Sequence, residues 1–321
     1  MTSEFSRRQI LSTAGLAAAG LLGASAPRAA AAPTTPAATK AEDFTYCFNT
    51  STIRGQKLPL DKEVELVAKA GYQAIEPWIN EIRDYQRAGG SLADLRKKIA
   101  DLGLTVESSI GFAPWIIDDD EKRKKGLSDL QSDMDLVKQI GGKRIAAPPA
   151  GATDQANLNL LRAAERYRAA LEVGVKMEIT PQVEVWGFSK CLSRLGETAL
   201  VAIEAQHPQA CILPDVYHLY KGGSDFQGLK MIDGRAIQVF HMNDYPADYP
   251  RDKIKDADRV YPTDGVAPLK QILRDLMATG FRGVLSLELF NPEYYKQDPA
   301  VVVKTGLEKM KGAVSWALEG G

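Results

Sequence analysis

The sequence predicts an α/β protein built as a single-domain, closed (β/α)₈ barrel, a TIM barrel. Three observations indicate this fold. From residue 44 onward, short apolar runs alternate with longer amphipathic stretches. Eight such pairs can be counted. The segment that holds them has about 280 residues, which is a typical length for one barrel.

The strands are expected in the short apolar runs, at residues 44–49, 72–78, 104–112, 143–148, 180–187, 210–217, 236–244 and 283–290. The helices are expected where apolar residues recur at i, i+3 and i+4, at residues 60–71, 91–103, 124–142, 157–177, 193–206, 226–232, 266–280 and 299–319. Several helices end on a glycine, as at Gly71 and Gly280. A Rossmann-type sheet is disfavoured because no G-x-G-x-x-G follows the first strand.

The first 32 residues predict an export signal. The pair Arg7-Arg8 precedes a short run of Ala, Gly and Leu, and an alanine-rich stretch near residues 30–32 offers a processing site. We interpret 1–32 as a twin-arginine signal peptide, 33–42 as a linker and 43–321 as the barrel. The apolar run is shorter than the roughly 20 residues that cross a bilayer. We therefore expect a periplasmic or extracellular protein without a stable membrane anchor after cleavage.

Composition excludes one class of partner. Lys and Arg number 40 against 41 Asp and Glu, for a net charge of -1, so no basic surface for nucleic acid is expected. The cysteines Cys47, Cys191 and Cys211 lack C-x-x-C spacing and are interpreted as buried hydrophobic residues. His207 precedes a strand and is expected at the opposite end of the barrel from the active site. The oligomeric state is left open, a homo-oligomer included.

Four predicted strands carry a candidate metal ligand near their carboxyl ends, where barrel active sites lie. These residues are Glu184, Asp215, His241 and Glu288. A charged carboxylate in an apolar strand is costly unless it is paired or coordinated. One such carboxylate could be neutralised by Lys or Arg, but four candidates on consecutive strands favour one divalent cation. Oxygen and imidazole ligands suit Mn²⁺, Mg²⁺, Co²⁺ or Zn²⁺.

The segments QVEVWGFSK, LPDVYHLYKGGS, FHMND, DRVYPTDG and LSLELFN resemble the xylose isomerase-like barrel superfamily. This superfamily contains sugar phosphate isomerases and epimerases, ketose 3-epimerases and inosose dehydratases. The resemblance implies that the four candidates bind the metal and that Glu184 and Glu288 act as acid and base. It also implies proton abstraction next to a carbonyl, through an enediolate, on a small carbohydrate. An isomerase or epimerase is therefore expected.

The resemblance also implies substrate contacts from His218, Arg259 and Glu76. Trp186 and Trp115, which follow predicted strands, and Lys190 are further candidates for substrate contact. Glu76 could instead support a metal ligand, and the two tryptophans could wall the pocket or simply pack. Ketose 3-epimerases have a second glutamate where this chain has Lys190, which argues against a free ketohexose. Pro214 cannot donate within a strand, and it is interpreted as the place where the sixth strand ends.

Two other functions remain open. The first is an exported lyase, dehydratase or hydrolase that acts on keto-sugars or 3-keto-glycosides with the same metal site. The second is a metal-dependent sugar-binding protein without turnover. A metal endonuclease of the same superfamily is disfavoured because a multi-zinc cluster needs several histidines, and this chain has 3.

Overall fold

The computed structural model describes residues 40–319. The predicted signal peptide lies outside these residues, as does most of the predicted linker. The described residues form one compact unit. None of their helices combines the length and the apolar character that a membrane span requires.

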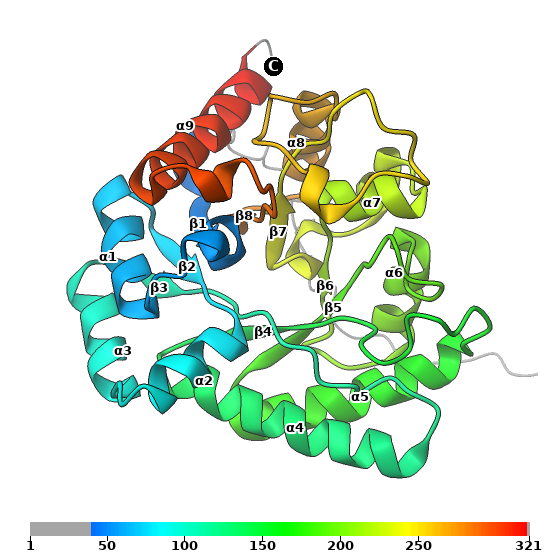
Figure 1. The fold of residues 1–321 in the computed structure, drawn as a ribbon. Helices are drawn as coiled ribbons and strands as arrows, with labels where there is room; N and C mark the ends of the chain where they lie inside the picture. The colour runs from blue at the N-terminus through cyan, green and yellow to red at the C-terminus, as the bar shows by residue number, and fades with distance from the viewer. Residues whose placement is uncertain (1–39, 320–321) are drawn as a thin grey trace, which may run out of the picture. The chain divides into compact units, whose positions relative to one another are not determined.

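Eight parallel strands form the centre of the described residues, and helices surround them (Figure 1). The strands are β1 (Thr45–Asn49), β2 (Ala74–Glu76), β3 (Thr105–Val106), β4 (Arg144–Ala147), β5 (Thr180–Glu184), β6 (Ile212–Leu213), β7 (Val239–Met242) and β8 (Val284–Leu287). Five strands pair in the order β3-β2-β1-β8-β7, and three in the order β4-β5-β6.

Backbone hydrogen bonds and isolated bridges close the two gaps between these sets of strands. The amide of Ala146 donates to the carbonyl of Ser109 at 2.9 Å, which joins β4 to the segment after β3. The amide of His241 donates to the carbonyl of Pro214 at 3.0 Å, which joins β7 to the end of β6. The predicted closed barrel is therefore confirmed.

The helices are α1 (Leu60–Ala70), α2 (Ile79–Arg87), α3 (Leu92–Asp101), α4 (Asp120–Gln139), α5 (Leu160–Met177), α6 (Leu195–Glu204), α7 (Val216–Gly222), α8 (Leu269–Ala278) and α9 (Pro299–Leu318). The sequence did not predict α2. The segment expected as a helix at 226–232 is a 3₁₀ helix, Phe226–Met231.

The sixth strand is shorter than predicted, because residues 216–217 belong to α7. Pro214 follows the strand directly, as its missing donor implies. The next residue, Asp215, caps α7 by accepting a hydrogen bond from the amide of His218 at 2.7 Å. The strand-to-helix junction thereby fixes the Asp215 carboxylate at the carboxyl end of β6.

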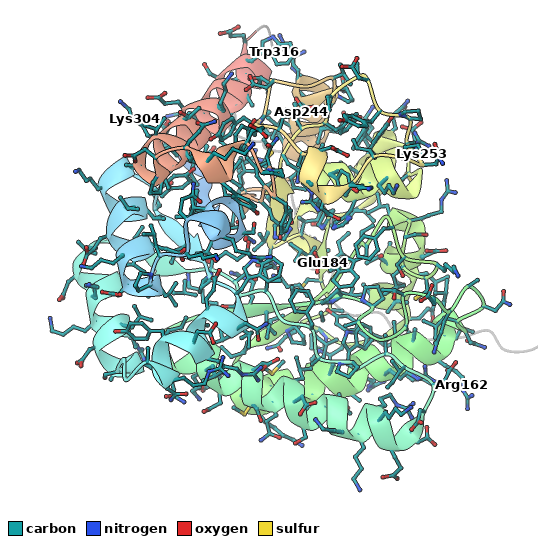
Figure 2. The ribbon with its side chains drawn as sticks, in the orientation of Figure 1. Arg162, Glu184, Asp244, Lys253, Lys304 and Trp316 are labelled. Atoms are coloured by element: carbon teal, nitrogen blue, oxygen red, sulfur yellow. The ribbon has the colours of Figure 1, made fainter. Side chains whose placement is uncertain are left out.

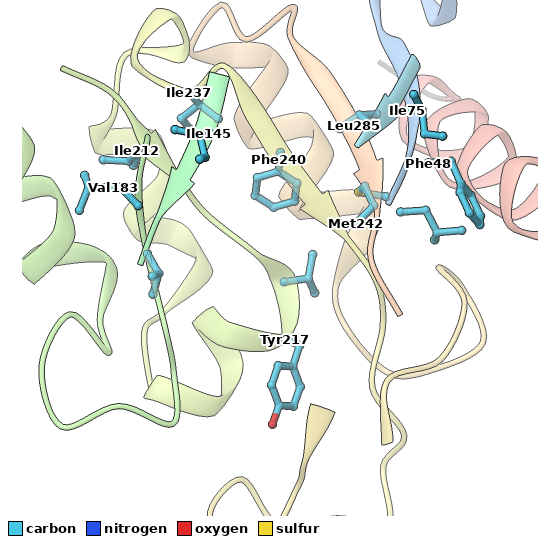
Figure 3. Close-up of a cluster of buried hydrophobic side chains, with 14 of the residues drawn as sticks. Phe48, Ile75, Ile145, Val183, Ile212, Tyr217, Ile237, Phe240, Met242 and Leu285 are labelled. Atoms are coloured by element: carbon cyan, nitrogen blue, oxygen red, sulfur yellow. The ribbon is translucent and has the colours of Figure 1, made fainter. Parts of the chain in front are cut away.

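A large apolar core lies between strands and helices. Figure 3 shows Phe48, Phe240, Met242 and Leu285 from β1, β7 and β8 among its buried side chains. A smaller cluster includes Cys47, Ala74, Ala146, Val239 and Val284, and all of these residues are buried. Along β1, β2, β4, β7 and β8 its members alternate with the side chains of the large core, so they face the interior of the barrel.

Candidate active site

The polar residues of the site continue the inward face of the strands. Side chains two residues apart on a strand share a face. Asn49 therefore follows Cys47 on β1, Glu76 follows Ala74 on β2 and His241 follows Val239 on β7. The interior of the barrel is apolar in one layer and polar in the next layer toward the carboxyl ends of the strands.

Asp215, His241 and Glu288 form the centre of this polar layer. All three are buried, and one potential ligand atom from each lies within 4.8 Å of the others. The Nδ1 atom of His241 lies 3.8 Å from Oδ2 of Asp215 and 3.3 Å from Oε2 of Glu288. It has no hydrogen-bond partner in the described part of the chain. The imidazole thus directs an uncommitted nitrogen at two carboxylates.

Glu76 fixes the orientation of that imidazole. Its Oε2 atom lies 3.1 Å from Nε2 of His241, on the other side of the ring from Nδ1. The same oxygen accepts hydrogen bonds from Ser286 Oγ at 2.7 Å and from Asn49 Nδ2 at 2.9 Å. A carboxylate behind a histidine in this manner is typical of metal sites, where it orients the ring. Glu76 does not line the cavity, so its place beside His241 agrees with the supporting role.

Glu184, the last residue of β5, faces the same cavity but is not part of the three-residue set. Figure 2 shows it near the centre of the barrel. It is 3% exposed, and its Oε2 atom has no partner among the described residues. Burial raises the pKa of Glu184 well above its usual range; His241 opposes this, whereas Glu288 and Asp215 raise it further.

Arg259 is buried against the same carboxylates. Its Nη1 atom donates to Asp215 Oδ2 at 3.0 Å and to Glu288 Oε2 at 2.8 Å. Its Nη2 atom donates to Asp256 Oδ1 at 2.6 Å and lies 3.1 Å from Nε2 of His218. Burial alone would lower the pKa of Arg259, but the carboxylates of Asp215, Asp256 and Glu288 raise it above its usual range. The guanidinium is therefore a fixed positive charge at the cavity.

The local field favours positive charge between the carboxylates. Burial alone would lower the pKa of His241, but Glu288 and Glu76 hold it well above its usual range. Burial alone would raise the pKa of Glu288, yet His241 and Arg259 hold it low. Burial lowers the pKa of His218 to about 3, so this ring is neutral.

These observations fit a divalent cation. Glu76, Glu184, Asp215 and Glu288 place four buried carboxylates in one layer, against one guanidinium and one imidazole. The unpartnered atoms, His241 Nδ1 and Glu184 Oε2, are both potential ligands. Carboxylates with one imidazole suit hard to borderline divalent metals and do not select among them.

The cavity beside this layer has a volume of about 300 Å³. Three of the residues predicted to contact substrate line it, namely His218, Arg259 and Trp186. Trp115 does not line it: the side chain is fully buried, and its Nε1 atom donates to the carbonyl of Pro148 at 2.9 Å. In the described structure Trp115 therefore packs in the core and lies outside the cavity lining.

Lys190 also lies outside the cavity lining. Its side chain is 59% exposed, and its Nζ atom lies 3.2 Å from Oδ1 of Asp154. In the described structure the side chain of Lys190 is thus directed at solvent and Asp154, away from the cavity. The three cysteines are buried free thiols, as predicted.

The sequence analysis did not identify two asparagines and one aspartate that contact the polar residues of the site. Asn49 donates to Glu76 and to Glu288 Oε1, and it accepts from Trp78 Nε1 at 2.8 Å. Asn243 donates to Asp215 Oδ2 at 2.7 Å. Asp256 pairs with Arg259 and lines the cavity. Asn49 ends β1 and Asn243 follows β7, so position at a strand end was the signal that could have found both.

Residues 64–313 match a family model described as xylose isomerase-like TIM barrel. The chain belongs to this family. It is similar to the inosose isomerase of Bacillus velezensis, with 27% identity over 273 residues that cover 84% of this chain and 96% of that protein. It is also similar to the 3-dehydroshikimate dehydratase of Pseudomonas putida, with 23% identity over 72% of this chain and 36% of that protein.

A solved structure supports the fold. The crystal structure of the IOLI protein with a bound zinc atom superposes with a TM-score of 0.79, 23% identity, and coverage of 85% of this chain and 98% of that one. At this identity the likeness shows the barrel alone. The curated relatives named above are an isomerase and a dehydratase, and this pair leaves the reaction class open.

Proposed function

We propose that the protein is a divalent-metal-dependent isomerase or epimerase of a small carbohydrate that carries a carbonyl group. The observation that carries this proposal is the set Asp215, His241 and Glu288, with an unpartnered His241 Nδ1 atom directed at two carboxylates. The inosose isomerase relatives support the substrate class.

In this proposal Asp215, His241 and Glu288 hold the cation, and Glu184 faces it as a fourth ligand or as the proton acceptor. When bound, the cation polarises the substrate carbonyl and the neighbouring hydroxyl and so acidifies the C–H bond between them. The positive charge of the cation would also favour the deprotonated form of Glu184, which could then accept the proton from that carbon and leave an enediolate. Return of that proton from Glu184 to the adjacent carbon would complete isomerisation, whereas epimerisation would need a second group that already carries a proton and delivers it to the other face, a role open to Glu288 only in its protonated form.

The other cavity residues position the substrate. Arg259 is held by Asp215, Glu288 and Asp256 at a fixed place beside the cavity. From there its guanidinium stabilises negative charge that develops on a substrate oxygen. The neutral ring of His218, whose Nδ1 atom accepts from the amide of Gly187 at 3.2 Å, presents its other edge to Arg259 and to the cavity.

A lyase or dehydratase is the second candidate, and the dehydratase relatives favour it. It uses the same proton removal but ends with loss of a β-hydroxyl or β-alkoxy group. A sugar-binding protein without turnover is the third. Export by the twin-arginine route remains part of the proposal and rests on Arg7-Arg8 and the run that follows. Sequencing the amino terminus of the mature protein from culture tests it.

The test of function is a screen of keto-sugars, inososes and keto-glycosides in D₂O, followed by mass spectrometry. The protein is first stripped by a chelator and then loaded separately with Mn²⁺, Mg²⁺, Co²⁺ or Zn²⁺. An isomerase or epimerase returns a product of unchanged composition that carries solvent deuterium on carbon. A dehydratase or lyase product has lost water or an alcohol. Turnover that is equal in the stripped and loaded protein would contradict the proposal.

A further inference from the structure

An aromatic belt surrounds the cavity. It consists of Phe290, Trp78, Phe112, Trp186 and Phe188. The ring centroids of successive members lie 5.9, 5.1, 5.9 and 5.0 Å apart, distances at which aromatic rings pack against each other. These five side chains come from segments that follow β2, β3, β5 and β8, so the belt is assembled from four of the eight connections at the mouth of the barrel.

The belt closes through the polar side of the cavity. Phe188 lies 5.7 Å from the His218 ring, between centroids. His218 contacts Arg259, whose guanidinium carbon lies 5.0 Å from the centroid of Phe290. The cavity is thus enclosed by aromatic carbon on most of its circumference and by charged groups on one arc.

Among the residues that line the cavity, the polar groups lie on that arc and at the bottom of the cavity. Outside the lining, the guanidinium of Arg54 stacks over Trp78, 3.8 Å from the ring centroid. The charged and imidazole groups that line the cavity are Glu184, His218, Asp256, Arg259 and Glu288. The other lining residues are the belt and Ile110, and the indole nitrogen of Trp78 already donates to Asn49. The C–H face of a sugar ring can stack on these aromatic side chains, but hydroxyl groups directed at the belt find no polar partner among its residues.

Two belt residues are exposed at the mouth. Phe112 is 39% exposed and Phe188 is 48% exposed. They follow different strands yet both border the cavity that holds the catalytic carboxylates. Large apolar side chains are exposed to water around this cavity, and a ligand that covers them binds more tightly because apolar surface is removed from water. The part of the ligand that reaches the mouth should therefore be apolar and flat.

We propose that the substrate is a keto-sugar that carries an aromatic or other planar apolar substituent, which packs against Phe112 and Phe188 while the sugar ring contacts the carboxylates. This assignment rests on the proposed function for the reaction at the sugar ring. It specifies the substrate class: a substituted sugar and not a free monosaccharide.

Binding of matched glycosides tests the assignment. The probes are phenyl and methyl β-glucopyranoside, and phenyl and methyl β-galactopyranoside, titrated into the metal-loaded protein by calorimetry. In at least one pair the phenyl compound should bind about tenfold more tightly than the methyl compound. Equal affinity within both pairs, or no binding by any member, would overturn the assignment.

Variants locate the substituent. Phe112→Ala and Phe188→Ala should each reduce the phenyl-to-methyl affinity ratio about threefold or more, and Phe112→Leu should retain most of it. The matched control is Trp316→Ala, an exposed aromatic residue on α9 that Figure 2 shows at the periphery, away from Glu184. An unchanged ratio in both alanine variants, with circular dichroism showing folded protein, would also overturn it.

The two proposals fail in different ways. Keto-sugar turnover with equal phenyl and methyl affinities keeps the proposed reaction and removes the substituent. Preferential phenyl binding that depends on Phe112 and Phe188, without turnover of any keto-sugar, keeps the aromatic subsite and removes the proposed reaction.

Discussion

The two ends of the barrel both contain buried charge, but they neutralise it differently. At the amino-terminal end, Glu107 accepts from Lys143 Nζ at 2.5 Å and from Arg144 Nη1 at 2.9 Å. Arg144 also donates to Gln238 at 3.0 Å. At the carboxyl-terminal end, four buried carboxylates share one guanidinium and one imidazole, and potential ligand atoms remain without partners.

This difference separates a structural ion cluster from a functional one. Glu107 has two cations of its own, and both Lys143 and Arg144 keep some solvent access. Such a cluster is complete without a ligand. The cluster at the other end has an excess of carboxylates and excludes water from most of them. Such an excess of carboxylates is relieved either by a further cation or by protonation of one carboxyl, and the raised pKa of Glu184 identifies the group at which a cation would replace the proton. The carboxyl-terminal end is therefore the candidate metal site.

The largest effect is expected from Glu184→Gln. If Glu184 accepts the substrate proton, its replacement by glutamine should lower kcat by about 10²–10⁴-fold, because glutamine cannot act as a base. Metal content should fall little, since Asp215, His241 and Glu288 remain. The assays are steady-state kinetics and elemental analysis of the purified protein. Glu107→Gln at the other end is the control and should leave kcat unchanged. A Glu184→Gln protein with normal kcat would remove Glu184 from the mechanism.

Exchange of arginine for lysine at each end sharpens the comparison. Arg259→Lys should lower kcat/KM by about 10–100-fold, because one ammonium cannot hold Asp215, Glu288 and Asp256 in place of a planar guanidinium. Arg144→Lys should leave kcat/KM within about twofold and alter only stability. Parallel kinetics of the two variants provide the test. Equal losses of activity would show that the ends of the barrel are not functionally distinct.

The sequence was sufficient for the barrel and for the members of the polar layer that are chemically conspicuous. Alternating apolar and amphipathic runs revealed every strand, and Glu184, Asp215, His241 and Glu288 stood out as polar residues inside apolar runs. The closeness of Asp215, His241 and Glu288 depends on barrel closure between β6 and β7. That closure rests on two isolated bridges, Ile212 with Ile237 and Asp215 with His241, which leave no periodic signal in the sequence.

Other features could not be predicted because they depend on side-chain direction. Trp115 and Trp186 both follow strands in apolar surroundings, yet one packs beneath Pro148 and the other lines the cavity. Lys190 follows β5 and was a candidate for substrate contact, but the local turn directs it to Asp154. Asn49 was missed because an asparagine at a strand end is also a common turn residue.

The amino-terminal cluster predicts a pH dependence of stability. Burial alone would raise the pKa of Glu107, but hydrogen bonding to Lys143 and the charge of Arg144 hold it below its usual range. A lowered folded-state pKa contributes stability that is complete above the unfolded value of about 4.3 and is lost as pH falls through the folded value. Glu107→Gln should cost about 2 kcal/mol near pH 7.

That cost should shrink as pH falls below about 4, where Glu107 of the parent protein becomes protonated. Urea unfolding of the parent and the variant across this range measures it. A difference in unfolding free energy that is independent of pH would show that Glu107 acts through packing and not through its charge.

The smallest effects are expected from phenylalanine substitutions at Trp115 and Trp186, which should differ in whether stability or KM changes. Trp115→Phe should cost about 1–2 kcal/mol of stability, because the carbonyl of Pro148 loses its buried donor and the smaller ring leaves space beside Tyr167. KM should not change, since Trp115 does not reach the cavity. Trp186→Phe should show the reverse, with nearly unchanged stability and a raised KM. Thermal unfolding and steady-state kinetics on both variants distinguish packing from substrate contact. A raised KM for Trp115→Phe would show that Trp115 affects substrate binding after all.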